Sequence, residues 1–213
     1  EFKGSYSLER DFVDHYRGAQ NTYDYVWEER RNRDEGYGKI IPEAIKGLLA
    51  KTNLTIGDID RLAYPCFFKA DHRKIAKTLG AKPEALIDNL HAELGECGAA
   101  HSFLLLIKAL ETAKPGDKII VAGYGQGANA LLFEHLSELS PEDWTAPRPV
   151  NFGSLAGIAN HVILADRAWL SRFTGSGDSP AAIDTIPYPG FTDLLTARRA
   201  EDARIMAFAQ ALD

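Results

Sequence analysis

The sequence predicts an α/β fold in which helices pack on a layered sheet. From Ile40 to Gly80, a helix, a short apolar strand and a second helix follow one another. Residues 97–113 then have the composition of a buried helix, and two strand-like segments lie on either side of residues 125–127. Helices that alternate with short apolar strands are typical of a sheet covered by helices.

The first part of the chain predicts a short strand, one or two polar helices and then an amphipathic helix. Residues 1–38 are rich in aromatic and charged side chains, with no clean alternation after the first positions. Pro42 suits the first turn of a helix. Apolar residues then recur at helical spacing up to Asn53, namely Ile41, Ile45, Leu48 and Leu49.

The next segments predict a buried strand, Leu62–Tyr64, and a helix that ends at Gly80. In residues 97–113 apolar side chains surround nearly the whole helix, which indicates burial on all sides. After the turn at residues 114–117, the segments KIIVAGYG and NALLFEHL predict two strands joined across residues 125–127.

Beyond Leu136 the composition changes, and we divide the chain into residues 1–137 and a peripheral extension, 138–213. Prolines become frequent, a helix is indicated near residues 158–173, and a Gly/Ser/Pro stretch follows. The last sixteen residues, RRAEDARIMAFAQALD, predict a terminal helix.

Composition limits the class of protein. With 213 residues, 45% hydrophobic and 25% charged, the chain is globular rather than disordered. The net charge of -6 argues against nucleic acid as the main partner. Two cysteines without paired spacing, and the lack of a long apolar run or a signal pattern, predict a cytosolic protein that does not enter a membrane. The chain opens on Glu1-Phe2 without methionine, so we expect residues upstream.

Four motifs in order resemble the C-terminal half of the thiolase superfamily: DFVDHYRG, IPEAIKGLL, GECGAAHSFLLLIKALE and KPGDKIIVAGYGQGANALLFE. The resemblance covers roughly residues 5–137 and points to proteins similar to hydroxymethylglutaryl-CoA synthase and 3-oxoacyl-ACP synthase III. It implies one half of a layered thiolase-like fold, with a mixed five-stranded sheet and a buried central helix. It also implies an enzyme that forms or cleaves a carbon–carbon bond in an acyl-CoA or acyl-ACP.

The family draws its cysteine nucleophile from the N-terminal half, which this chain does not contain. The resemblance therefore implies a partner, either an N-terminal-half thiolase-like chain or a further segment, in a dimer of thiolase-fold units. A small OB-fold, zinc-binding subunit is a further implied partner. Coenzyme A thioester would be a substrate, with no covalently bound cofactor and no metal in this chain.

Matching the motifs residue by residue puts changed side chains at the family's catalytic positions. The family's histidine falls at Tyr64 or Pro65, and its asparagine falls at Glu96. The second cysteine of true thiolases falls at Tyr124 or Gln126. The resemblance therefore implies chemistry that differs from that of ordinary synthases.

Three residues at the start of the apolar helix are candidate catalytic groups. Glu96 could be a base with a pKa raised by burial, or a charge that the helix dipole favours. Cys97 could be a thiolate at a position that mirrors the family's nucleophile, or a small buried side chain. His101, one turn further on, could be a base or a hydrogen-bonded core histidine.

Two phenols and the strand-connecting turn complete the candidate site. Tyr64 and Tyr124 could donate a proton to a developing enolate or alkoxide, or could simply pack at strand ends. The turn is expected to bring backbone amides beside the active site, so we assign substrate binding to Gly123, Gly125, Gln126, Gly127 and Asn129. We expect His72 and its charged neighbours to form a solvated helix face, with a secondary role near CoA phosphates.

Two other functions stay open. The chain could be a noncatalytic scaffold subunit that completes a heteromeric complex, because both expected polar catalysts are changed. A nucleotide-binding module is the weaker alternative, because no glycine-rich loop links a strand to a helix.

Overall fold

The computed structural model describes residues 1–125, 127–135, 139–177 and 179–212, and it divides the chain into two compact units. Unit 1 is Glu1–Ser137 and unit 2 is Glu138–Asp213. None of the helices within the described ranges is both long enough and apolar enough to span a membrane.

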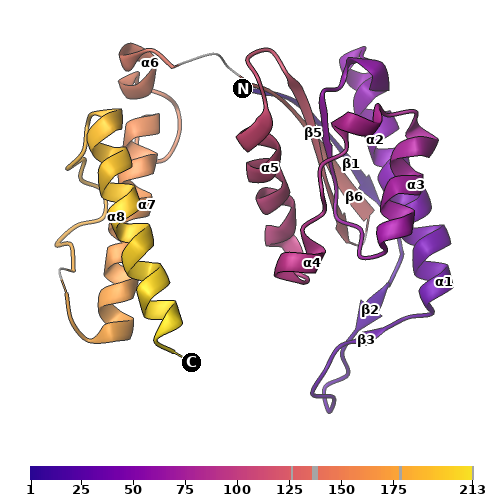
Figure 1. Cartoon of the computed structure of the whole chain (residues 1–213), viewed down its shortest axis with the longest axis horizontal. Coiled ribbons are helices and arrows are strands. Elements are labelled where there is room, and N and C mark those ends of the chain that lie inside the picture. The colour runs from indigo at the N-terminus through magenta and orange to yellow at the C-terminus, as the bar shows by residue number, and fades with distance from the viewer. Residues whose placement is uncertain (126, 136–138, 178, 213) are drawn as a thin grey trace. The chain divides into compact units, whose positions relative to one another are not determined.

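Unit 1 is a mixed sheet with helices on both faces, which confirms the predicted α/β class (Figure 1). Its elements in chain order are β1 Phe2–Glu9, β2 His15–Tyr16, β3 Tyr25–Val26, α1 Glu29–Arg31, a π-helical stretch Asn32–Tyr37, α2 Gly38–Thr52, a 3-10 turn Ile56–Asp58, β4 Arg61–Ala63, α3 Lys69–Leu79, a 3-10 turn Pro83–Ala85, α4 His91–Leu94, a 3-10 turn Gly98–Ala100, α5 His101–Thr112, β5 Lys118–Gly125 and β6 Gly127–Glu134.

The sheet has the strand order β1-β6-β5-β4 among the described residues, four strands where five were expected. β4 and β5 are parallel, whereas β5–β6 and β1–β6 are antiparallel. Within the described ranges no fifth strand joins this sheet, and the segment beside β4 makes one isolated parallel bridge, Leu62 to Leu86. The two short strands β2 and β3 pair with each other in a separate hairpin.

Alternation along β5 explains the two helical layers. Ile120 and Ala122 face α2 and α3, in a core that also holds Ile45 and Leu48. Ile119 and Val121, which alternate with them along β5, face α5. They belong to a second core that also holds Ala63, Leu105 and Ala109. Period-2 alternation on a strand buried on both faces requires a helical layer on each side of the sheet.

Two helices differ from their sequence predictions. Pro42 lies within α2 rather than in its first turn, because the π-helical stretch leads directly into that helix. The helix expected at residues 97–113 begins at His101, and its outer face is exposed at Phe103 (66%) and Ile107 (55%). The inner face of α5 packs on β4 and β5 and, at its first residue His101, on His91, so its burial is one-sided.

Unit 2 contains α6 Pro141–Thr145, α7 Leu155–Thr174 and α8 Phe191–Gln210. α7 begins where the Ser154 hydroxyl accepts a hydrogen bond from the Gly157 amide, a typical N-cap. Its small core contains Ile163, Leu194 and Ala197. The buried Glu201 carboxylate lies 3.0 Å from both Arg167 and Arg204, so its charge is paired.

Candidate functional site

The candidate site lies where the chain leaves β4 and enters α5. Because β4 and β5 are parallel, their carboxyl ends lie at the same end of the sheet. Asn89 joins the two loops there, since its side-chain amide donates to the Cys66 carbonyl (2.6 Å) and its carbonyl accepts from His101 Nε2 (2.6 Å). The Ser102 hydroxyl reaches the Ala122 carbonyl of β5 (3.5 Å). Segments far apart in the sequence therefore meet at one place.

His91, Glu96 and His101 lie together at this place, and we call them the His91 cluster. Nε2 of His91 is 3.1 Å from Oε2 of Glu96. The rings of His91 and His101 stack with centroids 4.1 Å apart and planes inclined by 25°. His101 is fully buried and the His91 side chain is 6% exposed, whereas Glu96 is 53% exposed. The cluster thus joins two buried imidazoles to a carboxylate that reaches solvent.

Two glycines fold the loop that forms the cluster. Gly95 and Gly98 both have positive φ, +67° and +56°, which side chains with a Cβ rarely adopt. They let the chain reverse between α4 and α5, so that His91 and His101, ten positions apart, stack on each other. Oε1 of Glu96 accepts from the Gly98 amide at 2.8 Å, which holds the carboxylate over this loop.

Cys97 lies in the same loop but points elsewhere. Its thiol donates a weak hydrogen bond to the Leu94 carbonyl at 3.8 Å, and the residue is partly exposed. Cys97 follows Glu96 in the sequence, but its thiol contacts the Leu94 carbonyl. Its role as a thiolate stays a prediction.

The Tyr64 hydroxyl is hydrogen-bonded to α3 and not to a residue of the His91 cluster. The residue is fully buried, and its hydroxyl donates to the His72 carbonyl at 2.6 Å. Burial raises the pKa of this phenol well above its ordinary value, and burial likewise raises the pKa of the neighbouring Cys66 thiol to about 12. Both groups therefore stay protonated at neutral pH, and Tyr64 fastens α3 to the end of β4.

Tyr124 lies near the end of β5 and stacks on Tyr37, with ring centroids 4.3 Å apart. Its hydroxyl is buried and has no hydrogen-bond partner within the described ranges. Burial raises the pKa of both phenols, so each is a hydrogen-bond donor rather than a base at neutral pH. The structure therefore brings together Glu96 and His101 of the predicted catalytic set, while Tyr64 and Tyr124 contact α3 and Tyr37.

The predicted binding residues Gly123, Gly125, Gly127 and Asn129 lie at the paired ends of β5 and β6. Gly123 pairs with Asn129, and Gly125 pairs with Gly127. Gln126 lies outside the described residues. A Cβ added at Gly127 would lie 2.0 Å from the Leu8 carbonyl oxygen of β1, so this glycine is needed for close strand packing. The assignment of these residues to substrate binding stays a prediction.

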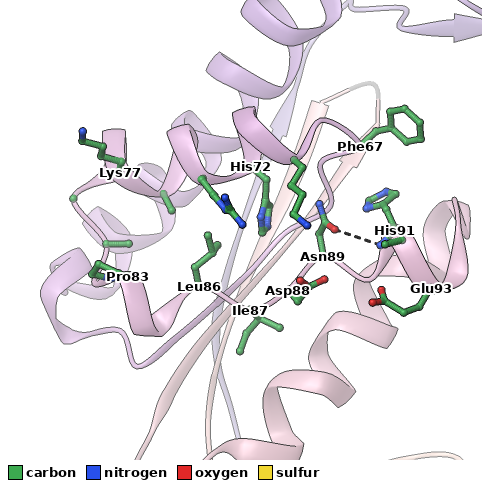
Figure 2. Close-up of a pocket in the computed structure, with 16 residues that line it drawn as sticks. Phe67, His72, Lys77, Pro83, Leu86, Ile87, Asp88, Asn89, His91 and Glu93 are labelled. Carbon is green, nitrogen blue, oxygen red and sulfur yellow. Dashed lines mark hydrogen bonds between the residues drawn. The ribbon is translucent and has the colours of Figure 1, made fainter.

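A groove of about 940 Å³ runs between α3 and residues 80–93. In Figure 2, His72 points from α3 into this groove, with Lys77 and Pro83 at one end and His91 and Phe67 at the other. The dashed line marks the bond from the His91 amide to the Asn89 side chain, 3.3 Å. The groove therefore leads to the His91 cluster.

His72 corrects the expectation of a solvated helix face. His72 is 5% exposed and Asp71, 7% exposed, is bonded to Arg33 at 2.9 Å. α3 turns these residues inward together with Ile75, Ala76 and Leu79, leaving Arg73 and Lys74 exposed. Burial lowers the pKa of His72 to about 4, while the facing Asp88 carboxylate opposes this shift.

Acidification is expected to destabilise unit 1 through His72. The folded state holds this imidazole neutral down to about pH 4, whereas an unfolded histidine binds a proton below about 6.5. The contribution of neutral His72 to the free energy of unfolding is therefore fully present above the unfolded pKa. It falls by roughly 3 kcal/mol as the pH drops from about 6.5 to about 4. Urea unfolding across this range measures the loss.

The matched variant is His72→Gln, which cannot titrate and keeps the backbone carbonyl that Tyr64 uses. Carboxylates titrate in both proteins, so the difference between the two pH slopes isolates His72. Equal slopes would show that His72 is not held neutral by burial.

Sequence reasoning missed His91 and Asn89. Asn89 acts through its backbone carbonyl and through its side-chain bond to the Cys66 carbonyl. A backbone acceptor cannot be predicted from residue type, because every residue has one. His91 carries no motif spacing to His101, and only the glycines at 95 and 98 signal that the loop turns back.

Two family models match parts of the chain. Residues 49–134 match the model described as 3-oxoacyl-acyl-carrier-protein synthase III C terminal. Residues 118–213 match the model of the DinB family. The two matches overlap at β5 and β6, and the second one includes all of unit 2.

The chain is also similar to curated synthases. Hydroxymethylglutaryl-CoA synthase of Aeropyrum pernix is 34% identical over 133 residues, which are 61% of this chain and 36% of that protein. The synthase of Methanopyrus kandleri is 31% identical over 137 residues, 62% of this chain and 38% of the relative. The chain thus spans little more than a third of the length of these relatives.

A solved structure agrees with the fold. The 3-oxoacyl-(acyl carrier protein) synthase III of Pseudomonas aeruginosa aligns with a TM-score of 0.52 and 16% identity, over 65% of this chain and 44% of that one. These similarities confirm the resemblance to the thiolase superfamily, and unit 1 has half of a thiolase-like fold.

Proposed function

We propose that unit 1 is the C-terminal half of a thiolase-superfamily condensing or cleaving enzyme, acting on a carbon–carbon bond of an acyl-CoA or acyl-ACP. A cysteine nucleophile on another segment or chain would hold one acyl group. The observation that carries the proposal is the His91 cluster, in which Glu96 occupies the position where the resemblance puts the family's asparagine. Asn89 links this cluster to the Cys66 carbonyl, close in sequence to Tyr64 and Pro65, where the resemblance puts the family's histidine.

Glu96 and His91 are the groups proposed for proton transfer. A carboxylate hydrogen-bonded to an imidazole can remove a proton next to a thioester carbonyl and return it to the product. The exposed Glu96 faces solvent, where a substrate can approach. His101 orients the pair from beneath through its stacked ring and its bond to Asn89.

The partners belong to the same proposal. They are an N-terminal thiolase-like half, a second thiolase-fold unit and a small OB-fold, zinc-binding subunit. The apolar outer face of α5 supports a covering half, because Phe103, Ile107 and Leu110 recur at helical spacing and are all exposed.

Denaturing intact-mass spectrometry tests the proposal. The protein as purified, with everything that accompanies it, is incubated with short and aromatic acyl-CoAs. We expect an acyl adduct on a polypeptide segment other than residues 1–213. An adduct on this chain would instead move the nucleophile to Cys97 or Cys66, and Cys97→Ser against Cys66→Ser would separate the two.

The noncatalytic scaffold remains the alternative, because the Tyr64 hydroxyl is already bonded to the His72 carbonyl. A partner that co-purifies without any acyl adduct on either polypeptide would favour the scaffold and contradict the enzyme. An adduct that forms but does not turn over when Glu96→Gln is introduced would support the enzyme.

A further inference from the structure

We propose that the His91 cluster is a binding site for a divalent cation of the zinc class, with His91, Glu96 and His101 as its three protein ligands. One donor atom from each residue lies within 4.8 Å of the other two. These three ligands share no short sequence motif and come together only in the folded loop.

The hydrogen bond of His101 determines which of its nitrogens can bind a metal. A carbonyl oxygen only accepts, so Nε2, 2.6 Å from the Asn89 carbonyl, must carry the proton. In the neutral ring Nδ1 then has a free lone pair, and it is buried without a partner in the described part of the chain. Metal-binding histidines typically donate their other N–H to a backbone carbonyl in this way.

His91 offers its Nε2 on the side of Glu96. This nitrogen lies 3.1 Å from Oε2 of Glu96, close to the separation of two ligands on one tetrahedral ion. Buried polar atoms without partners, such as Nδ1 of His101, are rare and call for an explanation such as a missing ion. Because the centroids of the two stacked rings are 4.1 Å apart, one ion can be shared by both histidines.

Glu96 supplies the anionic ligand and the means of closing the site. Ligands about 2.0–2.1 Å from Zn²⁺ lie roughly 3.3 Å from each other in a tetrahedron, so the atoms must approach by about 1.5 Å at most. The Glu96 side chain is 53% exposed and can rotate by this amount. Its Oε1 is bonded to the Gly98 amide, which leaves Oε2 for the ion.

The donor set selects the class of cation. Two imidazoles and a carboxylate suit zinc and neighbouring transition metals, whereas magnesium and calcium prefer oxygen ligands. Three protein ligands leave a fourth position open in a tetrahedral site. The partly exposed carboxylate puts this open position on the solvent side of the cluster.

The consequence for catalysis rests on the proposed function. Metal coordination and proton transfer use the same lone pairs of His91 and Glu96, so the two states exclude each other. A bound cation is therefore expected to inhibit acyl turnover. Binding itself is measured without any acyl thioester, which keeps a failure of this proposal separate from a failure of the proposed function.

The test is a titration of the full chain, freed of metal with a chelator, with Co²⁺ alone. Visible absorption of tetrahedral Co²⁺ should rise and saturate at one equivalent, and Zn²⁺ should abolish it by displacement. No sulfur-to-cobalt charge-transfer band is expected, because no cysteine is in the ligand set. Circular dichroism of the same samples confirms that each protein is folded.

Variants assign the ligands. Glu96→Gln and His91→Ala are each expected to weaken Zn²⁺ binding by at least about tenfold. His101→Ala is not used, because loss of this fully buried side chain could prevent folding. The controls Glu93→Gln, His15→Ala and Cys97→Ser remove a neighbouring carboxylate, an exposed histidine and the nearest thiol, and each should bind as the unmodified chain does.

The proposal is overturned by any of three results with folded protein. These are the absence of saturable Co²⁺ absorption, unchanged affinity in both Glu96→Gln and His91→Ala, or a thiolate band that disappears in Cys97→Ser.

Discussion

Replacing Gly127 by alanine is expected to destabilise unit 1 by roughly 3 to 5 kcal/mol, a large effect for a single methyl group. Gly127 has φ of +123°, which strains any residue with a Cβ. The added methyl would lie 2.0 Å from the Leu8 carbonyl oxygen, which is backbone and cannot rotate away. Because β1 pairs with β6 beginning at Glu9 and Gly127, the edge of the sheet must separate. Urea unfolding followed by circular dichroism measures the loss.

Gly125→Ala is the matched control in the same hairpin. A Cβ there meets nothing within 4 Å, and Gly125 does not have positive φ. Its effect on the free energy of unfolding should stay within about 0.5 kcal/mol. Comparable losses in the two variants would mean that both positions need glycine, and that the close approach of β1 to Gly127 is not the cause.

The sequence predicted the layers of unit 1 because its apolar residues follow simple periods. The spacing of Ile41, Ile45 and Leu48 places one face of α2 in the core, as expected. The strand segments after residue 117 form the expected β5–β6 pair. The prediction failed for the orientation of α3, which turns Asp71 and His72 inward. Hydrophobicity alone does not predict this, because the charge of Asp71 is paired with Arg33 and burial keeps His72 neutral.

The site was predicted only in part, because its contacts depend on loops. Glu96 and His101 stand out as polar residues at the start of an apolar helix, and the structure brings them together through His91. The partner of the Tyr64 hydroxyl is a backbone carbonyl, which has no signature in a sequence. The unpaired nitrogens of the two histidines depend on tautomers fixed by Asn89 and Glu96, and therefore on the folded loop.

Replacing Leu105 by alanine is expected to cost unit 1 about 2 to 5 kcal/mol of unfolding free energy. Leu105 is fully buried on the inner face of α5, where it packs with Ala63, Ile119 and Val121. The shortened side chain loses its transfer free energy and leaves a cavity against a sheet that cannot collapse around it. The urea midpoint should fall while the denaturant slope stays unchanged.

Ile107→Ala, two positions further along the same helix, is the control, and it also tests the proposal that an N-terminal thiolase-like half covers α5. Ile107 is 55% exposed in this chain, so its truncation should change the free energy of unfolding by less than about 0.5 kcal/mol. In an assembly where a second thiolase-like half covers α5, the same truncation removes a buried side chain and should lower the free energy of unfolding by about 2 kcal/mol. An Ile107 effect that is small in the chain alone and equally small in the acyl-accepting assembly would contradict α5 as the surface joining the two halves. A large effect only in the assembly would support the proposal that the N-terminal half binds this face of α5.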